Sequence, residues 1–177
     1  MTNLTHRLAS ESDLTALRDL MYAAIDALQS SFLTPAQVAA SHAIMGLDTT
    51  LIADGTYFLV ERDGALAGCG GWSRRATLYG GNHTAGRDDA LLDPAHDAAR
   101  IRAMYTHPAF TRLGVGKRVI DLCESAARAE GFRRAELVAT LAGEPLYRAC
   151  GYAQIERFDS AAIDGVTVPL VRMGKAL

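Results

Sequence analysis

Hydrophobic and polar residues alternate along several short stretches of the chain, the pattern of strands with one buried face. These stretches are Leu4–Ala9, Tyr57–Arg62, Ala65–Trp72, Ile101–Thr106, Arg134–Leu141, Tyr152–Asp159 and Val166–Met173. Asp63–Gly64 and Asp164–Gly165 stand between consecutive stretches, and such dipeptides favour two-residue hairpin turns. The sequence therefore predicts about seven strands, and the hairpin at Asp63–Gly64 should pair with the strand that ends at Thr106.

A helical spacing of apolar residues fills much of the remaining chain. After Ser10 and Asp13, which suit a helix start, the first apolar face consists of Leu14, Leu17, Leu20, Met21 and Ile25. A second helix start is indicated by Thr34, Pro35 and Gln37. A third helix should follow Gly116, with apolar residues from Val119 to Ala127. Residues 74–98 are rich in Gly, Asp, Asn and His, which predicts an irregular connection.

Composition and charge narrow the class of protein. The 177 residues are 49% hydrophobic and 21% charged, which predicts a single globular domain over residues 1–177. A net charge of -2 gives no reason to expect nucleic-acid binding. Apolar runs are far shorter than the ~20 residues of a membrane span, and no secretion signal opens the chain, so we expect a cytoplasmic protein. Three widely spaced cysteines favour neither a disulfide framework nor a zinc site.

The segment Thr111–Arg118, with the sequence TRLGVGKR, carries the strongest chemical signal. It joins a predicted strand to a predicted helix, whose first N–H groups lack partners and whose dipole favours an anion. Gly114 and Gly116 would let a diphosphate approach the backbone, and positive charge would come from Arg112, Lys117 and Arg118. This segment predicts a site for a phosphorylated ligand.

Two common phosphate-binding motifs do not fit this segment. A dinucleotide fingerprint that began at Gly114 would need Gly or Ala where the chain has Val119. A Walker A loop would need Gly in place of Thr111, and Ser or Thr in place of Arg118. A nucleotide-dependent oxidoreductase and a nucleotide triphosphatase are therefore disfavoured.

The segment instead resembles the pyrophosphate loop of the GNAT superfamily of acyl-CoA-dependent acyltransferases, which reads Arg or Gln, two residues, Gly, any residue, Gly or Ala. Here the frame runs from Thr111 to Gly116, so both glycines match while Thr111 departs from the pattern and Arg112 would partly replace it. A second motif, Pro145–Tyr152, resembles the family's short helix that carries a tyrosine and precedes a glycine and an aromatic residue. The two motifs occur in the family's order.

The resemblance implies an α/β fold with a mixed, mostly antiparallel sheet of about seven strands, flanked by helices. A central parallel pair, Arg102–Thr106 and Arg134–Leu141, would splay apart and receive acetyl-CoA as co-substrate. Free N–H groups near Met104 and Tyr105 would bond the pantetheine arm and polarise the thioester carbonyl. The residues expected to contact coenzyme A are Met104, Tyr105, Thr106, Arg112, Leu113, Gly114, Val115, Gly116 and Lys117.

The resemblance also implies transfer of an acetyl group to an amine by direct attack on the thioester. Tyr147 is the predicted general acid, which hydrogen-bonds or protonates the departing thiolate. The structural alternative is that Tyr147 only packs beneath Tyr152. A covalent route through the neighbouring Cys150 is disfavoured.

The general base stays open at this point. Candidates are Glu61, Asp97, His107 and Glu144, each of which also has an ordinary structural explanation. Transfer of the amine's proton to ordered water needs none of them.

Trp72 and Tyr79 bracket part of the glycine-rich connection and could form one wall of an acceptor pocket, near Arg74, Arg75, Asn82 and His83. Trp72 could equally belong to the core of its strand. The sequence shows neither a basic groove nor a long acidic trough, so we expect a small-molecule amine rather than a protein amine. Oxygen acceptors, a homodimer through the C-terminal strands, and a non-catalytic acyl-CoA binding or sensing module stay open.

Overall fold

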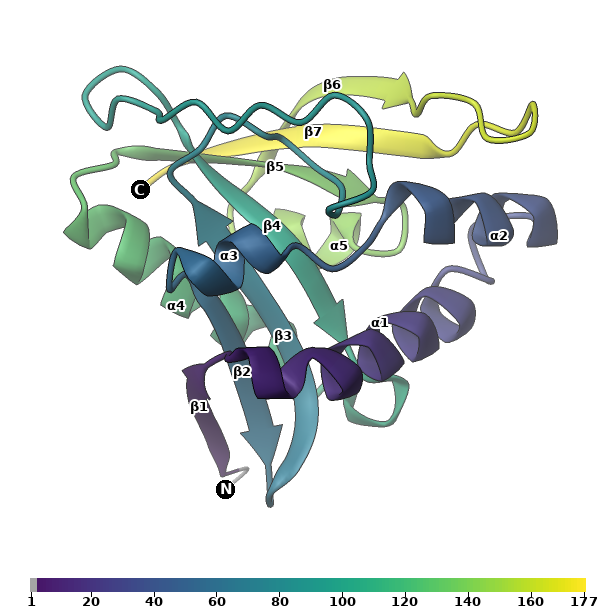
Figure 1. Ribbon diagram of the computed structural model, residues 1–177, viewed down its shortest axis with the longest axis horizontal. Helices are drawn as coiled ribbons and strands as arrows, with labels where there is room; N and C mark the ends of the chain where they lie inside the picture. The colour runs from purple at the N-terminus through teal and green to yellow at the C-terminus, as the bar shows by residue number, and fades with distance from the viewer. Residues whose placement is uncertain (1–2) are drawn as a thin grey trace.

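The computed structural model describes residues 3–177, and its centre is one seven-stranded sheet (Figure 1). The strands are β1 (Leu4–Leu8), β2 (Tyr57–Arg62), β3 (Ala65–Ser73), β4 (Ala99–Thr106), β5 (Arg134–Thr140), β6 (Ala153–Asp159) and β7 (Pro169–Ala176). They lie in the order β1-β2-β3-β4-β5-β7-β6, and β4 and β5 are parallel while the other neighbours are antiparallel. The predicted fold class is confirmed, as is the pairing of β3 with β4.

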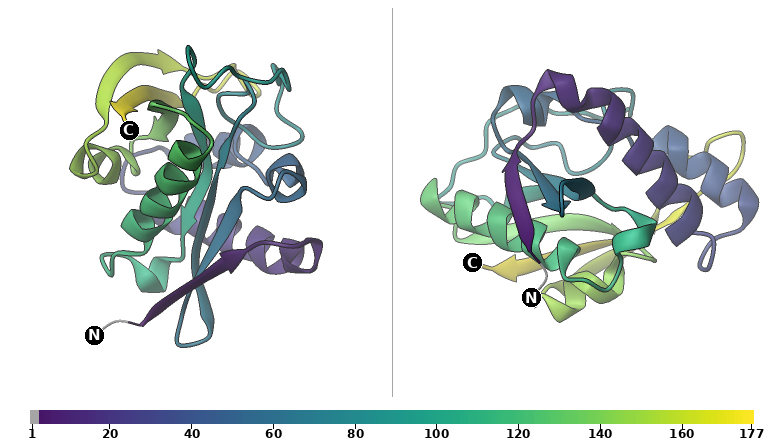
Figure 2. Two further views of the ribbon diagram at one scale, coloured as in Figure 1. Left: turned by 90° about the vertical axis from the view of Figure 1, so that its left-hand side faces the viewer. Right: turned by 90° about the horizontal axis from the view of Figure 1, so that it is seen from below.

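Helices cover both faces of this sheet. They are α1 (Leu14–Leu28), α2 (Pro35–Ile44), α3 (Thr49–Ala53), α4 (Val115–Ala129) and α5 (Glu144–Ala149), with 3-10 turns at Glu11–Asp13 and Pro108–Phe110. Figure 2 shows α1, α2 and α3 on one face, and α4 with α5 on the other. The periodicity did not predict α3, because five residues are too few to show a helical repeat.

The predicted capping residues begin the first helices. The N–H of Ser10 donates to Asp13 Oδ2 at 2.8 Å. At α2, the N–H of Gln37 donates to Thr34 Oγ1 at 3.2 Å, and the N–H of Thr34 donates back to Gln37 Oε1 at 3.1 Å. Both helix starts are confirmed, since each pair satisfies N–H groups that the helix itself leaves unpaired.

Both predicted hairpin turns are also present. Asp63 and Gly64 have φ of 51° and 81°, and Asp164 and Gly165 have φ of 50° and 78°, the positive values that a tight hairpin turn of this kind requires. Around the second turn the ladder is reduced to the bridge between Ile163 and Val166. For that reason β7 begins at Pro169, three residues later than predicted, and continues to Ala176.

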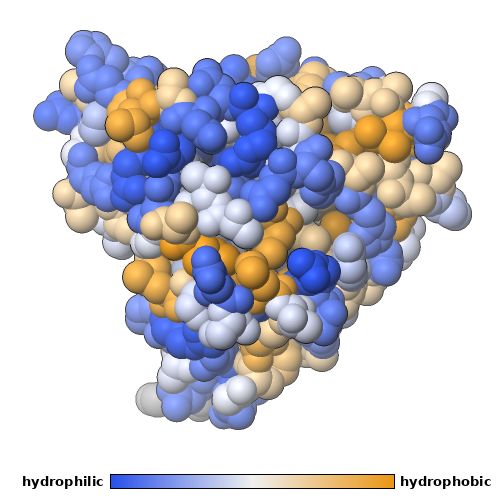
Figure 3. Space-filling view, viewed as in Figure 1, coloured by the Kyte–Doolittle hydropathy of each residue, from blue (hydrophilic) through white to orange (hydrophobic). Residues whose placement is uncertain are grey.

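Helix α4 lies very close to β3. A Cβ atom added at Gly68 would stand 2.5 Å from Val115 Cγ1, and one added at Gly70 would stand 2.6 Å from Val119 Cγ1. Those distances leave no room for a side chain, so two glycines of β3 set the depth at which α4 packs. On the opposite face, Figure 3 shows apolar atoms gathered between α1 and α3, while polar atoms cover most of the surface above α3.

Strand β4 contains a bulge that the sequence pattern did not reveal. The alternation predicted Ile101, Ala103 and Tyr105 on one face, but Ile101 packs in the core under α4, whereas Ala103 and Tyr105 pack toward α1. The register with β3 passes from Cys69↔Tyr105 to Gly71↔Arg102, so β4 has one extra residue there. Ala103, in the bulge, has a φ of 50°. After the bulge, the side chains that the alternation placed on the face of Ile101 lie on the opposite face of the sheet.

The parallel pair splays apart after two residues of pairing. Ala99 pairs with Ala135 and Arg100 pairs with Glu136, and β4 and β5 diverge beyond that point. The closed end is held by Glu136 Oε2, which accepts from Arg100 Nη1 at 2.9 Å and from Arg172 Nη2 at 2.6 Å. The predicted splay is therefore present, and an ion cluster from three strands closes one end of it.

Candidate active site

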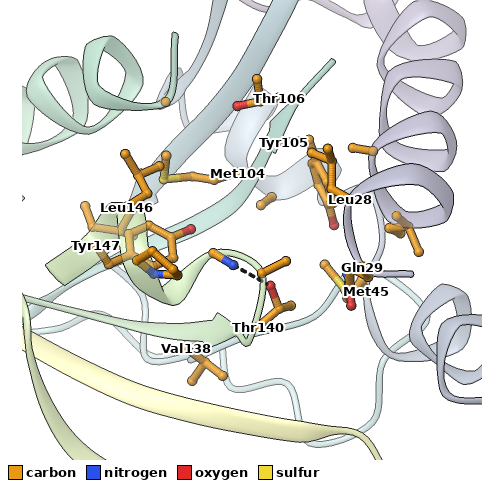
Figure 4. A pocket seen from close by; sticks show the side chains of 18 of the residues that line it. Leu28, Gln29, Met45, Met104, Tyr105, Thr106, Val138, Thr140, Leu146 and Tyr147 are labelled. Carbon is orange, nitrogen blue, oxygen red and sulfur yellow. Dashed lines mark hydrogen bonds between the residues drawn. The ribbon is translucent and has the colours of Figure 1, made fainter. Parts of the chain in front are cut away.

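A cavity of about 730 Å³ occupies the opening between β4 and β5. Its walls come from both faces of the sheet, because the start of α4 and part of α5 line one end while α1 and the segment around α2 line the other. Figure 4 shows Tyr147 and Leu146 on one side of it, and Leu28, Gln29 and Met45 across from them. The cavity therefore connects the two faces of the sheet through the splay.

Most of the residues predicted to contact coenzyme A line this cavity. Those that do are Met104, Tyr105, Thr106, Arg112, Gly114, Val115, Gly116 and Lys117. Leu113 does not line it, although it belongs to the same loop. One continuous loop and the end of β4 thus bring eight of the nine predicted residues together.

The loop before α4 exposes backbone donors. The N–H of Ala109 donates to His107 Nδ1 at 3.1 Å, which fixes the 3-10 turn at Pro108–Phe110. Gly114 then caps α4 with a φ of 82° and no side chain, so no side-chain oxygen occupies the first N–H groups of the helix. Such a helix start binds anions, and a diphosphate fits its chemistry.

The two glycines of the loop have different roles. Gly114 needs its positive φ, and a Cβ atom there would meet nothing within 4 Å. Gly116 has an ordinary helical conformation, but a Cβ atom there would stand 2.5 Å from Leu146 Cδ2 on α5. Conformation explains the first glycine, and packing between α4 and α5 explains the second.

The three predicted cations of the loop are used differently. Arg112 is exposed, lines the cavity and has no ion-pair partner in residues 3–177. Lys117 also lines the cavity, and its Nζ lies 2.9 Å from Asp121 Oδ2, which raises the pKa of the lysine. Arg118 does not line the cavity, and its Nη2 lies 3.2 Å from His6 Nδ1 on β1. The expectation that Arg118 surrounds the ligand is therefore not met.

The register of β4 decides which backbone N–H groups face the opening. The N–H of His107 donates to Ala67 O at 2.9 Å, and Tyr105 pairs with Cys69. Because successive N–H groups of a strand point to opposite edges, the N–H of Tyr105 is directed to β3, while those of Met104 and Thr106 face the opening. The prediction of a free N–H at Tyr105 is corrected in favour of Met104 and Thr106.

Tyr147 lies on α5, and its hydroxyl points into the cavity (Figure 4). Its ring also packs edge-on against Tyr152, with centroids 6.2 Å apart, so the packing alternative describes the ring but not the hydroxyl. No group in the described part of the chain hydrogen-bonds that hydroxyl. Burial raises the pKa of Tyr147 above its ordinary value, so the side chain is a proton donor at neutral pH.

A family model described as the acetyltransferase (GNAT) family matches residues 20–152, more than half of the chain. The chain belongs to this family. The match contains both the loop before α4 and the tyrosine of α5, the two features that form the wall of the cavity. None of the curated proteins matches the chain.

Several solved structures have the same fold. A GCN5-related N-acetyltransferase from Rhodopseudomonas palustris has a TM-score of 0.73 and 20% identity, over 100% of this chain and 98% of that chain. The PaiA N-acetyltransferase of Thermoplasma acidophilum in complex with coenzyme A has a TM-score of 0.66 and 12% identity, over 99% of each chain. YncA of Salmonella typhimurium, solved with acetyl-CoA, has a TM-score of 0.63 and 16% identity, over 98% of this chain and 93% of that chain.

None of the four predicted bases lines the cavity of this GNAT domain. Glu61 and Glu144 pair with arginines, at 3.4 Å to Arg7 Nε and 2.7 Å to Arg148 Nη2. His107 holds the 3-10 turn, and Asp97 accepts from the N–H of Asp93 at 2.7 Å. The structural explanation therefore holds for each of the four residues.

The wall predicted around Trp72 is mostly absent from this GNAT cavity. Trp72 is 2% exposed and packs edge-on against Phe132, so it is a core residue. Arg74 pairs with Glu130 and Arg75 pairs with Asp54, both away from the cavity. Asn82 and His83 do not line it either, whereas Tyr79 does. Of that group, the connection contributes only Tyr79.

The sequence did not indicate the far end of the cavity, which we call the α1–α2 arm. It is lined by Ile25, Leu28, Gln29, Phe32, Ile44, Met45, Leu78, Tyr79 and Leu170. Ile25 and Leu28 are apolar residues at helical spacing on α1, a pattern that a sequence assigns to a core. The one sequence signal for the arm was Gln29, a polar residue that continues the apolar face of α1. In the structure Gln29 is 4% exposed.

A covalent route through Cys150 finds little support in the structure. Cys150 does not line the cavity, and burial raises the pKa of its thiol, which opposes a thiolate nucleophile. Residues 3–177 contain no cluster of three His, Cys, Asp or Glu side chains placed to hold a metal ion. Among the helices described, none has the length and apolar character needed to span a bilayer.

Proposed function

We propose that this GNAT domain transfers the acetyl group of acetyl-CoA to the amine of a small molecule, by direct attack of the amine on the thioester. The observation that carries the proposal is the single cavity that joins the helix start at Gly114 to the hydroxyl of Tyr147 through the opening between β4 and β5. The bound coenzyme A and acetyl-CoA in two structures of the same fold support the same co-substrate here.

The diphosphate of the co-substrate would lie at the start of α4. Backbone N–H groups of Val115, Gly116 and Lys117 would donate to its oxygens, since the helix leaves them unpaired. Arg112 would add an unpaired positive charge. The pantetheine arm would then run along β4 toward the opening, where the N–H groups of Met104 and Thr106 face it.

In the chemical step, the amine nitrogen forms a bond to the thioester carbon as the carbonyl electrons move onto oxygen. The N–H of Met104 would stabilise that oxygen. When the carbonyl re-forms, the bond from carbon to sulfur breaks, and Tyr147 would donate a hydrogen bond to the departing thiolate. The proton of the attacking nitrogen would pass to water, since none of the four candidate bases lines the cavity. The raised pKa of Tyr147 makes complete proton transfer to sulfur unfavourable, so hydrogen bonding is its main contribution.

A small acceptor fits the α1–α2 arm better than a protein chain does. The arm is bounded by α1, by α2 and by residues 78–80 of the connection. Arg102 fastens that connection to the sheet, since its Nη2 donates to Gly80 O at 2.6 Å. A space bounded on several sides favours a compact ligand.

The test is acetylation of an amine panel with acetyl-CoA, followed by thiol release and by the mass of the product. We expect steady turnover by the wild type and a large loss in Tyr147→Phe. Tyr22→Phe is the matched control, because Tyr22 is 45% exposed on α1 and does not line the cavity. Tight CoA binding with no acetylated product would instead indicate a binding or sensing module. Preferential acetylation of peptides would indicate a protein acceptor.

A further inference from the structure

The α1–α2 arm carries no side chain that could pair with a second positive charge on an acceptor. In the described chain, no Asp, Glu or His side chain lines any part of the cavity. The arm is mainly apolar on and beside α1. Ile25 and Leu28 belong to this helix, Met45 also lines the arm, and so does Phe32, which is 51% exposed. Burial of an apolar body in this arm would be favourable.

The buried carboxylate behind the arm is already used. Asp48 is 1% exposed, and its Oδ2 lies 2.8 Å from Arg102 Nη2 and 3.2 Å from Arg87 Nη1. Its Oδ1 also accepts from the N–H of Thr50 at 3.0 Å. Arg102 lines the cavity, but its side chain is 2% exposed and its guanidinium is paired with Asp48, so Asp48 offers no free carboxylate to the arm. A second ammonium in the arm would therefore be desolvated without a counter-ion, which is costly.

The side-chain amide of Gln29 is a neutral polar group in the arm. Gln29 Nε2 lies 3.1 Å from Met45 Sδ, and a thioether sulfur is a weak acceptor. Within residues 3–177, the amide forms one other hydrogen bond, in which Ser41 Oγ donates to Gln29 Oε1 at 3.5 Å. Figure 4 places Gln29 and Met45 across the cavity from Tyr147. The amide can thus form one better hydrogen bond with a ligand, and it carries no charge.

We infer that the acceptor is a monoamine whose amino group is attached to an apolar aliphatic or aromatic body, without a second ammonium group. The inference rests on the proposed acetyl transfer and specifies its substrate class. Diamines, polyamines and aminoglycosides are disfavoured as acceptors, because no Asp or Glu of residues 3–177 lines the cavity.

The test compares amines of similar length and basicity with the wild-type protein, so that it does not depend on any variant. 3-Methylbutylamine and 2-phenylethylamine should have kcat/KM values at least about tenfold above those of 1,4-diaminobutane and 1,5-diaminopentane, measured as acetylated product. Equal or higher values for the diamines would overturn the inference.

A charge placed in the arm provides a second readout. Leu28→Glu should reduce the preference for 3-methylbutylamine over 1,5-diaminopentane about tenfold, because the new carboxylate can pair with the second ammonium. Tyr22→Glu introduces the same charge on α1 outside the cavity and should leave the preference unchanged. An unchanged preference in a folded Leu28→Glu protein, checked by circular dichroism, would contradict the inference.

Calorimetric titration of each amine into the protein saturated with CoA separates this inference from the proposed function. Binding of 3-methylbutylamine with no acetylation of any amine would overturn the function and support the apolar arm. Acetylation of diamines in preference to monoamines would support the function and overturn the arm.

Discussion

The hydroxyl of Tyr57 on β2 donates a hydrogen bond of 2.8 Å to the carbonyl oxygen of Ala103, the residue of positive φ in the bulge of β4. Tyr57 is 1% exposed, and burial raises its pKa well above the ordinary value, so it remains a donor. This bond holds the Ala103 carbonyl on the α1 side of the sheet. The bulge in turn decides that the next N–H, that of Met104, faces the opening.

Tyr57→Phe should therefore impair chemistry more than co-substrate binding. We expect kcat to fall several-fold with little change in the Kd for CoA, because the donor to the oxyanion is displaced while the helix start of α4 is intact. Stability should fall by about 1–3 kcal/mol, since a buried carbonyl loses its donor. Steady-state kinetics, CoA titration and urea unfolding measure the three quantities.

Ala103→Gly gives a control for this relationship. Glycine adopts a positive φ without strain, so the bulge then depends less on the hydrogen bond from Tyr57. The loss of kcat caused by Tyr57→Phe should be smaller in the Ala103→Gly protein than in the wild type. Equal losses in both backgrounds would mean that Tyr57 does not act through the bulge.

Tyr147→Phe should lower kcat by about 10²-fold, the usual contribution of a positioned proton donor, and leave the Kd for CoA within about twofold. The pH profile provides a second test. For the wild type, kcat/KM should rise with pH as the amine loses its proton. Because the pKa of Tyr147 is raised, no descending limb should appear below about pH 10. A descending limb near neutral pH would contradict this assignment.

Arg112→Gln should weaken CoA binding about fivefold or more and reduce its salt dependence, because an unpaired cation beside the diphosphate is lost. Arg118→Gln removes the same charge from the first turn of α4, just after that loop, but Arg118 contacts His6 and does not line the cavity. This control should change the Kd for CoA by less than about twofold. Equal effects would mean that the loop acts only through its overall charge.

Gly114→Ala should raise the Kd for CoA, since a φ of 82° costs an alanine roughly 1–2 kcal/mol and the loop would relax away from it. Gly116→Ala tests a different contact, because the added methyl group meets Leu146 rather than a strained backbone. Leu146→Ala should restore CoA binding in Gly116→Ala and should not restore it in Gly114→Ala. Rescue of both variants would contradict the separate roles.

Asp13→Asn should lower the Tm by about 1–3 °C near neutral pH, as expected for an ion pair at the surface whose arginine is about half exposed. The carboxylate accepts from Arg7 at 2.7 Å and from the N–H of Ser10 at 2.8 Å, and these bonds lower its pKa. A group with a lowered folded pKa stabilises above its unfolded pKa of about 3.9 and loses that effect as pH falls. The difference in Tm should therefore shrink between about pH 5 and pH 3.

The sequence predicted most strands, the capped helices and both turns because each depends on local chemistry. Thr34 and Gln37 hydrogen-bond to each other's backbone N–H groups. Asp164 and Gly165 readily adopt the positive φ of a tight turn. Neither pair needs a contact from a distant part of the chain. The start of α4 was predictable for the same reason, because Gly114 and the residues after it form a single local unit.

Features that depend on distant contacts could not be predicted in the same way. The bulge at Ala103 arises from the register with β3 and from a hydrogen bond with Tyr57, which lies 46 residues away. Trp72 resembled a pocket wall because its packing against Phe132 is invisible in the local pattern. The arm near Leu28 looked like core, since an apolar helix face does not show whether a neighbour or a ligand covers it.

The opening between β4 and β5 has one closed end, where Glu136 joins Arg100 and Arg172. Because the walls of the cavity come from both faces of the sheet, its two ends can hold the proposed co-substrate and acceptor at the same time. Kinetics with such a passage should be sequential, with a ternary complex, and not ping-pong.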